Sequence, residues 1–260
     1  MASKIIFVKT RTPYASYKDL WKLVELAEFP ICYPDEIDWQ SDNFYILTPI
    51  NGEVGPGITP RQPFPKRKCK IIWLNIEAPG EIEKDLIKMF DEVWMCDRDW
   101  AKKANTRFFF MASDERLNPS GTHDQPALSL AYLTNRRIPK YEEMGLDNDQ
   151  CLDSTVRETK MANTKAMVVL HQGEVPIMSP QRFCLTAAAG AAMFYERVPD
   201  FYPFEEYKDF IPITYENCVE VFREWINKPE LKQIAKNLHQ KMCLNTNFKK
   251  EVGRMFDGMD

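Results

Sequence analysis

The chain has 260 residues, of which 44% are hydrophobic and 28% are charged, and its formal net charge is −4. This composition is typical of a folded globular protein and excludes a disordered chain. The negative charge also argues against a protein that binds nucleic acid over its whole surface. No apolar stretch approaches the roughly 20 residues of a membrane span, so we predict a soluble cytoplasmic protein with no membrane partner.

The first half of the chain alternates short apolar runs with helical patterns. The apolar runs predict strands, and the helical spacing predicts helices over 17–29 and 81–90. The predicted strands cover residues 5–8, 44–47, 70–76, 93–95 and 108–111. Strands that alternate with helices are typical of a parallel sheet with helices on its faces.

A polar, turn-rich segment at 112–126 predicts a linker, after which the alternation restarts. Strands are predicted over 127–133, 166–170 and 210–213, and helices over 139–144, 156–162, 180–194, 216–227 and 230–243. Pro229 separates the last two helices because proline cannot continue the first. We therefore predict an α/β fold of two Rossmann-like lobes with parallel sheets, over residues 1–118 and 119–260.

Several polar groups of the second half follow predicted strands, and ligands of open α/β sheets bind beyond the carboxyl ends of the strands. Arg136 and Arg137 come after the first of these strands, and two guanidiniums suit bidentate contacts with phosphate. Ser179 and Pro180 predict a helix start, where N–H groups and positive partial charge favour an anion. Adjacent arginines are also common on a solvated surface, so that alternative stays open.

In this order the features resemble the C-terminal lobe of CgeB-type, spore-coat-maturation-like glycosyltransferases, which have the GT-B architecture. The resemblance runs from about Leu128 to Cys243. It rests on Thr134-Asn135-Arg136-Arg137, on the segment 161–170 and above all on the segment 180–191. That last segment, PQRFCLTAAAGA, is similar to the Arg-x-Phe-Glu-x-x-Ala-x-Gly helix of the family, with Arg182, Ala188 and Gly190 in register.

The resemblance implies a transferase that moves a sugar from a nucleoside-diphosphate donor, here taken as a UDP-sugar, to an acceptor hydroxyl. The second lobe would bind the donor through Thr134, Asn135, Arg136, Arg137, Lys165, Glu174, Ser179, Arg182, Gly190 and Glu196. The glutamate by which the family would hold the donor ribose falls on Leu185, which cannot accept a hydrogen bond, so Glu174 or Glu196 would replace it. An inactive relative that binds a nucleotide or nucleic acid is the alternative.

The reaction also usually needs a base that takes the proton of the acceptor hydroxyl. Glu77 is the first candidate because it follows a predicted strand of the first lobe, and Asp97 and His123 come next. The basic residues Arg61, Lys66, Arg67 and Lys68 would form an acceptor lip if the acceptor is a modified pyrimidine of phage DNA. A solvated loop also explains these four residues.

Neither a metal site nor a tightly bound cofactor is predicted. Asp97-Arg98-Asp99 and Asp147-Asn148-Asp149 match the Asp-x-Asp pattern that holds Mg²⁺ or Mn²⁺ in GT-A transferases, but so short a pattern is expected by chance in an acidic chain. The seven cysteines include no CxxC pair and are typical of reduced thiols. The absence of GxGxxG and GxxxxGK[ST] runs argues against dinucleotide oxidoreductases and P-loop NTPases.

Overall fold

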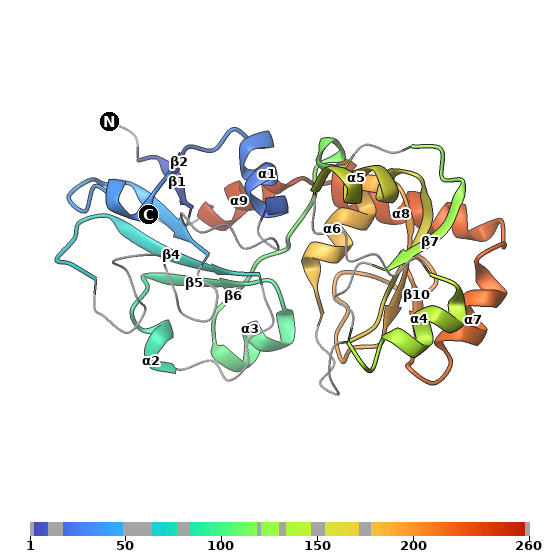
Figure 1. Ribbon diagram of the computed structural model, residues 1–260. Coiled ribbons are helices and arrows are strands. Elements are labelled where there is room, and N and C mark those ends of the chain that lie inside the picture. Colours follow the sequence, from blue (N-terminus) through green and yellow to red (C-terminus); the bar gives the residue numbers. More distant parts are fainter. Residues whose placement is uncertain are drawn as a thin grey trace. The chain divides into compact units, whose positions relative to one another are not determined.

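The structure is a computed structural model that describes residues 3–9, 18–48, 64–76, 84–118, 121–129, 134–146, 154–171 and 178–257. The chain divides into two compact units. The first unit is Met1–Met111 together with Glu251–Asp260, and the second is Ala112–Lys250. Each unit contains a parallel sheet with helices beside it (Figure 1), so the predicted α/β fold with two parallel sheets is confirmed.

The sheet of the first unit has the strand order β2-β1-β3-β4-β5-β6, and each described neighbour is parallel. Its strands are β1 (Ile5–Val8), β2 (Ile31–Cys32), β3 (Phe44–Leu47), β4 (Lys70–Asn75), β5 (Glu92–Met95) and β6 (Arg107–Phe108). Its helices are α1 (Lys18–Leu26), the short 3-10 helix η2 (Pro34–Glu36), α2 (Lys84–Ile87) and α3 (Arg98–Ala104). The sequence did not predict β2, because two residues are too few to show a pattern.

The C-terminal segment belongs to the first unit through helix α9 (Phe248–Phe256). The ring of Phe256 forms T-shaped contacts with the rings of Phe44 and Trp94, with centroids 4.9 and 5.3 Å apart. Arg107 donates a hydrogen bond to the carbonyl of Met255 over 2.7 Å. The predicted division at residue 118, with the whole C-terminus in the second lobe, therefore differs from the observed units at this end.

The division also differs at the start of the second unit. Ser113 donates its hydroxyl to the carbonyl of Cys184 over 2.9 Å, and its backbone N–H donates to the carbonyl of Met242. These contacts tie the segment that includes the 3-10 helix η3 (Glu115–Leu117) to the second unit. A segment predicted as a linker is thus partly built into the second core.

The sheet of the second unit has the order β10-β9-β8-β7, again with parallel neighbours among the described strands. The strands are β7 (Gln125–Ser129), β8 (Thr164–Val169), β9 (Ala192–Glu196) and β10 (Ile211–Ile213). The helices are α4 (Ile138–Met144), α5 (Ser154–Ala162), α6 (Pro180–Ala189), α7 (Cys218–Trp225) and α8 (Glu230–His239), and a π-helical turn η4 (Gln240–Leu244) follows α8.

The helix predicted over 180–194 is wrong in its second part, where the chain forms strand β9. Gly190 ends α6 with a φ of +68°, and its N–H bonds to the carbonyls of Thr186 and Ala187. Glycine takes this left-handed conformation without the cost of a Cβ. All five residues of β9 are buried, and a fully buried strand shows the same continuous apolar run as a buried helix. The correction places Glu196 at the carboxyl end of a strand.

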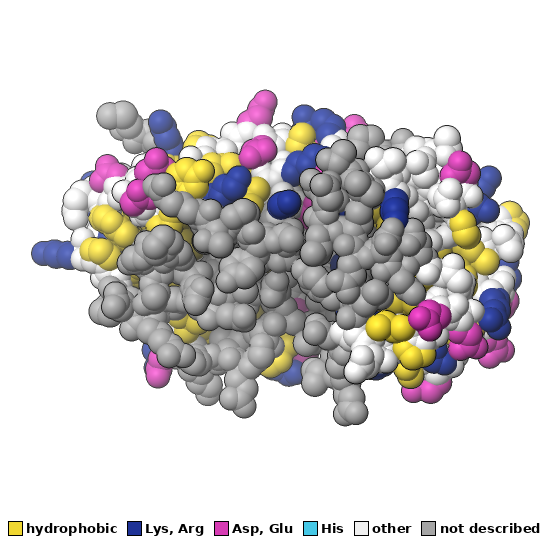
Figure 2. Space-filling view, in the orientation of Figure 1, with side chains coloured by type: hydrophobic (Ala, Val, Ile, Leu, Met, Phe, Trp, Pro, Cys, Tyr) yellow, Lys and Arg dark blue, Asp and Glu magenta, His cyan; other side chains and the backbone are white. Residues whose placement is uncertain are grey.

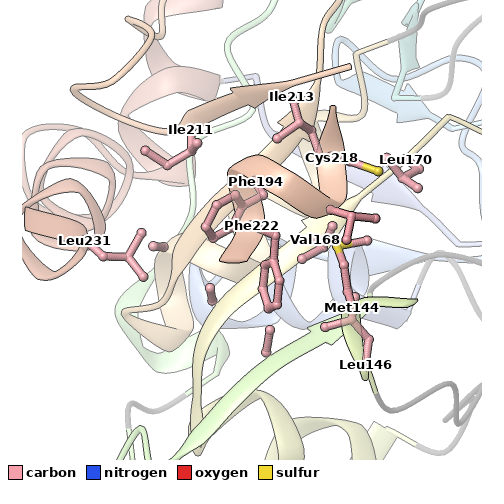
Figure 3. Packing of buried hydrophobic residues seen from close by; sticks show 14 of the residues in the cluster. Met144, Leu146, Val168, Leu170, Phe194, Ile211, Ile213, Cys218, Phe222 and Leu231 are labelled. Carbon is pink, nitrogen blue, oxygen red and sulfur yellow. The ribbon is translucent and has the colours of Figure 1, made fainter. Parts of the chain in front are cut away.

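A buried apolar cluster supports this sheet (Figure 3). Side chains of all four strands contribute, among them Val168, Phe194 and Ile211. Phe194 forms a T-shaped contact with Phe222 on α7, with ring centroids 5.4 Å apart. Burial of such side chains stabilises a fold by about 1.5–3 kcal/mol each, so this cluster stabilises the sheet of the second unit.

Candidate functional site

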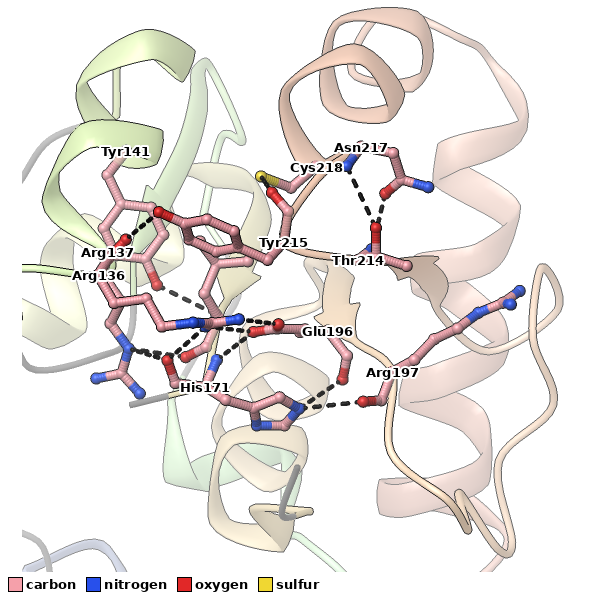
Figure 4. Close-up of polar contacts among 11 residues, drawn as sticks. Arg136, Arg137, Tyr141, His171, Glu196, Arg197, Thr214, Tyr215, Asn217 and Cys218 are labelled. Carbon is pink, nitrogen blue, oxygen red and sulfur yellow. Dashed lines mark hydrogen bonds and ion pairs between the residues drawn. The ribbon is translucent and has the colours of Figure 1, made fainter. Parts of the chain in front are cut away.

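The carboxyl ends of the strands of the second sheet bring together residues that lie far apart in the sequence (Figure 4). Arg136 and Arg137 come after β7, His171 comes after β8, Glu196 ends β9, and Tyr215 comes after β10. Because the strands are parallel, all these ends lie at one edge of the sheet, which is the usual place for a ligand. We call it the carboxyl edge.

Arg136 joins these strand ends to one another. Its guanidinium forms a two-pronged ion pair with Glu196: Nη1 donates to Oε2 over 2.9 Å and Nη2 donates to Oε1. Nη1 also donates to the carbonyl of His171 over 2.9 Å. The guanidinium carbon lies 4.2 Å from the ring centroid of Tyr215, whose hydroxyl donates to the carbonyl of Arg136. Bidentate pairing fixes the geometry as well as the charge, so Arg136 positions its neighbours.

Glu196 is the carboxylate partner in this arrangement. It is 7% exposed, and its Oε2 also accepts the backbone N–H of His171 over 2.6 Å. Three hydrogen bonds thus converge on one carboxylate, which leaves it poorly placed to take ribose hydroxyls in place of the residue missing at Leu185. Glu174, the other predicted replacement, lies outside the described residues.

His171 is a buried residue of the carboxyl edge, and its lowered pKa favours the neutral imidazole. Its Nε2 lies 3.0 Å from the carbonyl oxygen of Glu196 and 3.3 Å from that of Arg197. Carbonyl oxygens only accept, so Nε2 carries the hydrogen and donates. Burial lowers the pKa of His171, the charge of Glu196 opposes this, and Arg136 adds to it. Sequence reasoning did not select His171, although its place directly after a predicted strand was a usable signal.

Arg137 is the buried cation of the carboxyl edge, with 2% of its surface exposed. Its Nε donates to the carbonyls of Leu170 and His171 over 2.8 and 3.2 Å. Burial lowers the pKa of Arg137 to about 10, with the charges of Arg182 and Arg136 acting in the same direction and Tyr141 and Glu196 opposing them. Clustered like charges disfavour the charged form, and a bound anion would reverse that effect.

Helix α6 begins beside this cluster, because it follows β8 in the chain. Ser179 occupies the N-cap position without a side-chain capping bond, and its backbone N–H donates to the hydroxyl of Tyr195 over 2.6 Å. The positive end of the helix dipole therefore lies at the carboxyl edge together with Arg182 in the first turn.

Thr134 and Asn135 stand just before α4 at the same edge. The carbonyl of Thr134 accepts the N–H groups of Arg137 and Ile138. Within the described part of the chain, the hydroxyl oxygen of Thr134 is buried without a hydrogen-bond partner. A buried polar atom of this kind calls for an explanation, and a ligand is one.

Three predicted residues lie at the opposite end of the strands, which we call the amino edge. Lys165 is the second residue of β8, Gly190 precedes β9, and His123 precedes β7. At roughly 3.3 Å per residue, Lys165 lies about 13 Å from the carboxyl end of its own strand. The prediction that Lys165 converges with Arg136, Arg137 and Arg182 is therefore wrong. It treated a residue before a strand as if it followed one.

The basic residues predicted for the acceptor lie before β4, at the amino end of the first sheet. Arg67 pairs with Asp91 over 2.9 Å and Lys68 pairs with Asp42 over 2.8 Å. These carboxylates offset the charges, so Lys66, Arg67 and Lys68 do not form a uniformly positive lip. In the view of Figure 2, basic and acidic side chains are likewise interspersed over the described surface. Arg61 lies outside the described residues.

The candidate bases have different places. Glu77 lies outside the described residues. Asp97 caps helix α3, where its Oδ1 accepts the N–H of Trp100 over 2.9 Å. Nε2 of His123 lies 2.9 Å from the carbonyl oxygen of Ala189, to which it donates at the amino edge of the second sheet.

Among the described residues, no group of three or more His, Cys, Asp or Glu side chains could hold a metal ion, and Asp147 and Asp149 lie outside the described residues. The helices within them are all too short or too polar to cross a membrane.

Solved structures share the fold of the chain but resemble it only weakly in sequence. HepE from Anabaena, solved in complex with UDP-glucose, matches with a TM-score of 0.61 and 10% identity over 99% of this chain and 100% of HepE. TarM matches with a TM-score of 0.54 and 9% identity over 92% of this chain and 57% of TarM. The chain has the GT-B fold.

This GT-B fold is shown by structure alone. An identity of 9–10% is too low to transfer the roles of individual residues from these structures to this chain. The sequence matches no protein-family model and no curated protein.

Proposed function

We propose that this chain is a glycosyltransferase that transfers a sugar from a UDP-sugar to an acceptor hydroxyl. The observation that carries the proposal is that Arg182, in the first turn of α6, adds its positive charge to that of the buried Arg137 at the carboxyl edge. It stands in a GT-B fold, and one solved neighbour of that fold holds UDP-glucose. As the bond to the sugar breaks, negative charge grows on the departing diphosphate, and fixed cations stabilise it.

The side chains divide this work between them. Arg137 and Arg182 would face the diphosphate, with the α6 amides and the Thr134 hydroxyl as further donors. Arg136 is a positioning residue, because Glu196 already neutralises it. Two guanidiniums and a helix end supply the positive charge that a divalent cation supplies elsewhere, so we propose a metal-independent reaction without a tightly bound cofactor.

Among the three predicted bases we propose Glu77. Asp97 already caps a helix, and His123 lies at the amino edge, away from the proposed donor site. Glu77→Gln keeps the shape and removes the proton-accepting charge. It should reduce turnover by roughly 10²–10⁴-fold with little change in donor affinity. Turnover within a few-fold of the parent in folded variant protein would remove Glu77 from this role.

The acceptor is proposed only as a compound that presents a hydroxyl. The basic residues before β4 give a DNA acceptor little support, because Arg67 pairs with Asp91 and Lys68 pairs with Asp42. The CgeB-type resemblance likewise supports the transferase class rather than a particular acceptor.

An inactive nucleotide-binding relative is the second candidate function. Leu185, which stands where the family has its ribose-binding glutamate, is buried in α6, and Glu196 is occupied by Arg136. Such a protein would bind UDP without splitting a UDP-sugar. Slow hydrolysis of the sugar donor by the purified chain, measured as release of UDP, would decide for the enzyme.

Calorimetric titration with UDP and UMP tests the donor site directly. Arg182→Ala should weaken UDP binding by about 1.5–3 kcal/mol, the range for a charge-assisted hydrogen bond, and should weaken UMP binding less because UMP lacks the β-phosphate. The control is Arg223→Ala, which removes an exposed arginine of α7 that donates to the carbonyl of Glu143. Equal UDP affinity in parent and Arg182→Ala protein would contradict the assignment.

A further inference from the structure

A pocket of about 750 Å³ lies at the amino edge of the second sheet, at the other end of the strands from the arginine cluster. Apolar side chains of Ile226, Leu231 and Ala235 form part of its lining. Four lysines and two histidines also line it, and none of its described lining residues is Asp or Glu. The proposed donor site uses none of these residues.

Two of the four lysines share one face of helix α8. Lys232 and Lys236 are spaced four apart in α8, and residues at this spacing lie one above the other, whereas Lys228 lies two residues before the helix begins. Lys165 lines the pocket from β8. Lys228 pairs with Glu224 and lies over the ring of Trp225.

The other three lysines are exposed and have no carboxylate partner within the described part of the chain. Their ammonium groups gather around one concave surface that holds no acidic side chain of its own. Like charges placed together repel each other, and a ligand with several negative charges would relieve that repulsion.

The wall opposite α8 is firmly built. His123 has a φ of +53°, a conformation that costs a side-chain-bearing residue of order 1–3 kcal/mol and that persists only where the surroundings enforce it. Its Nε2 donates to the carbonyl of Ala189, and Nδ1 of His239 donates to the carbonyl of Ala187 over 2.8 Å. Both acceptors belong to the last turn of α6.

The segment that carries His123 is also fixed at both its ends. Gly121 donates to the carbonyl of Ala162 and Gln125 donates to the carbonyl of Asn163, both over 2.8 Å. A Cβ at position 121 would stand 2.6 Å from the carbonyl oxygen of Ala162, so only glycine fits there. Strained backbone held this tightly is found preferentially at binding sites.

We propose that this pocket binds a small ligand that carries two or more phosphate groups, separately from the donor. Its volume lies within the range of small-molecule sites, roughly 300–1,000 Å³. The lysines would contact the phosphates, and the apolar lining would contact the carbon part of a ligand such as a nucleoside polyphosphate. A nucleic acid fits less well, because the chain after Asn118 carries a net charge of −3 and is not a basic domain.

Calorimetry of the full chain with inorganic tripolyphosphate tests this site without a need to know the natural ligand. Lys232→Gln combined with Lys236→Gln should weaken tripolyphosphate binding roughly tenfold or more, since two charge-assisted contacts are lost. The matched control combines Lys249→Gln with Lys250→Gln, which removes two charges from exposed positions outside the pocket. Lys165→Gln provides an independent variant from the strand side.

Several results would overturn the proposal. Equal losses in the pocket variant and the control variant would show attraction by overall charge only. Loss in Arg182→Ala but not in the pocket variant, or displacement of tripolyphosphate by UDP, would place the ion in the donor site. Tighter binding of a single-stranded oligonucleotide, lost in the pocket variant, would identify a nucleic-acid surface instead. The pocket variant should bind UDP as tightly as the parent does. Failure of the pocket proposal would therefore leave the proposed function intact.

Discussion

The two edges of the second sheet hold positive charge in opposite ways. At the carboxyl edge, Arg136 and Arg137 are held by carbonyls and by Glu196, with Arg137 only 2% exposed. At the amino edge, Lys232 and Lys236 are exposed and make no ion pair with a carboxylate among the described residues. Hydrogen bonds thus fix the cations of the carboxyl edge, whereas the amino edge presents exposed ammonium groups.

This difference follows from the chemistry of the two side chains. A guanidinium is planar and donates in a fixed fork, whereas an ammonium is a point charge on a flexible stem. Stabilising a leaving diphosphate needs donors that stay in place as charge develops. Retaining a multiply charged ligand needs only a favourable potential. The comparison therefore supports a reacting site at the carboxyl edge and a binding pocket at the amino edge.

The largest expected effect is the loss of unfolding free energy when the ion pair between Arg136 and Glu196 is broken. Glu196→Gln keeps the shape of the side chain but leaves the guanidinium without its counter-charge. Removing one partner of a buried pair costs roughly 3–5 kcal/mol. Since the side chain of Arg136 is 25% exposed, we expect about 3 kcal/mol, the lower end of that range, in urea unfolding.

Glu206→Gln is the matched control, because Glu206 pairs with Arg197 just beyond the end of β9 with 38% and 53% of the two side chains exposed. Exposed pairs contribute about 0–1 kcal/mol. Equal losses in the two variants would mean that the Arg136 pair is no more than a surface contact.

A smaller loss of unfolding free energy should come from the protonation of His171. Its folded pKa is lowered by burial, so between that value and the unfolded value near 6.5 the unfolded chain binds more protons. Stability contributed by neutral His171 is therefore complete above about pH 6.5 and is lost as the pH falls below it, by up to about 1.4 kcal/mol per pH unit. His171→Gln, which can still donate to the same carbonyls, should flatten this slope in urea unfolding at several pH values. A slope unchanged by the substitution would assign it to other groups.

The smallest effect concerns the amino edge. Gly190 has a φ of +68°, and a Cβ in the left-handed region costs about 1–2 kcal/mol. Gly190→Ala should therefore lower the free energy of unfolding by about 1 kcal/mol. Gly253→Ala in α9, where a Cβ would meet nothing within 4 Å, should instead raise it by about 0.5–1 kcal/mol. Thermal unfolding of both variants checks the opposite signs, and the same sign for both would refute the capping role of Gly190.

The sequence by itself determined the features that depend on local patterns. The apolar run at 70–76 predicted β4 (Lys70–Asn75), and Ser179-Pro180 predicted the start of α6. Such signals work because a buried strand needs an unbroken apolar run and because proline is pre-set for the first turn of a helix. The alternation of these elements was enough to predict the α/β fold with two parallel sheets.

Only the tertiary structure decided which charges meet. Arg136 and Glu196 pair across 60 positions of the chain, and Glu196 reaches Arg136 only because 192–196 is a strand. Lys165 lies away from the arginines because it stands near the amino end of β8, whereas the arginines lie at the carboxyl ends of the strands. At the end of the chain, Phe256 packs against Phe44 of the first unit. Contacts between distant positions depend on the order and direction of strands, and these are set by packing across the whole core rather than by the residues on either side.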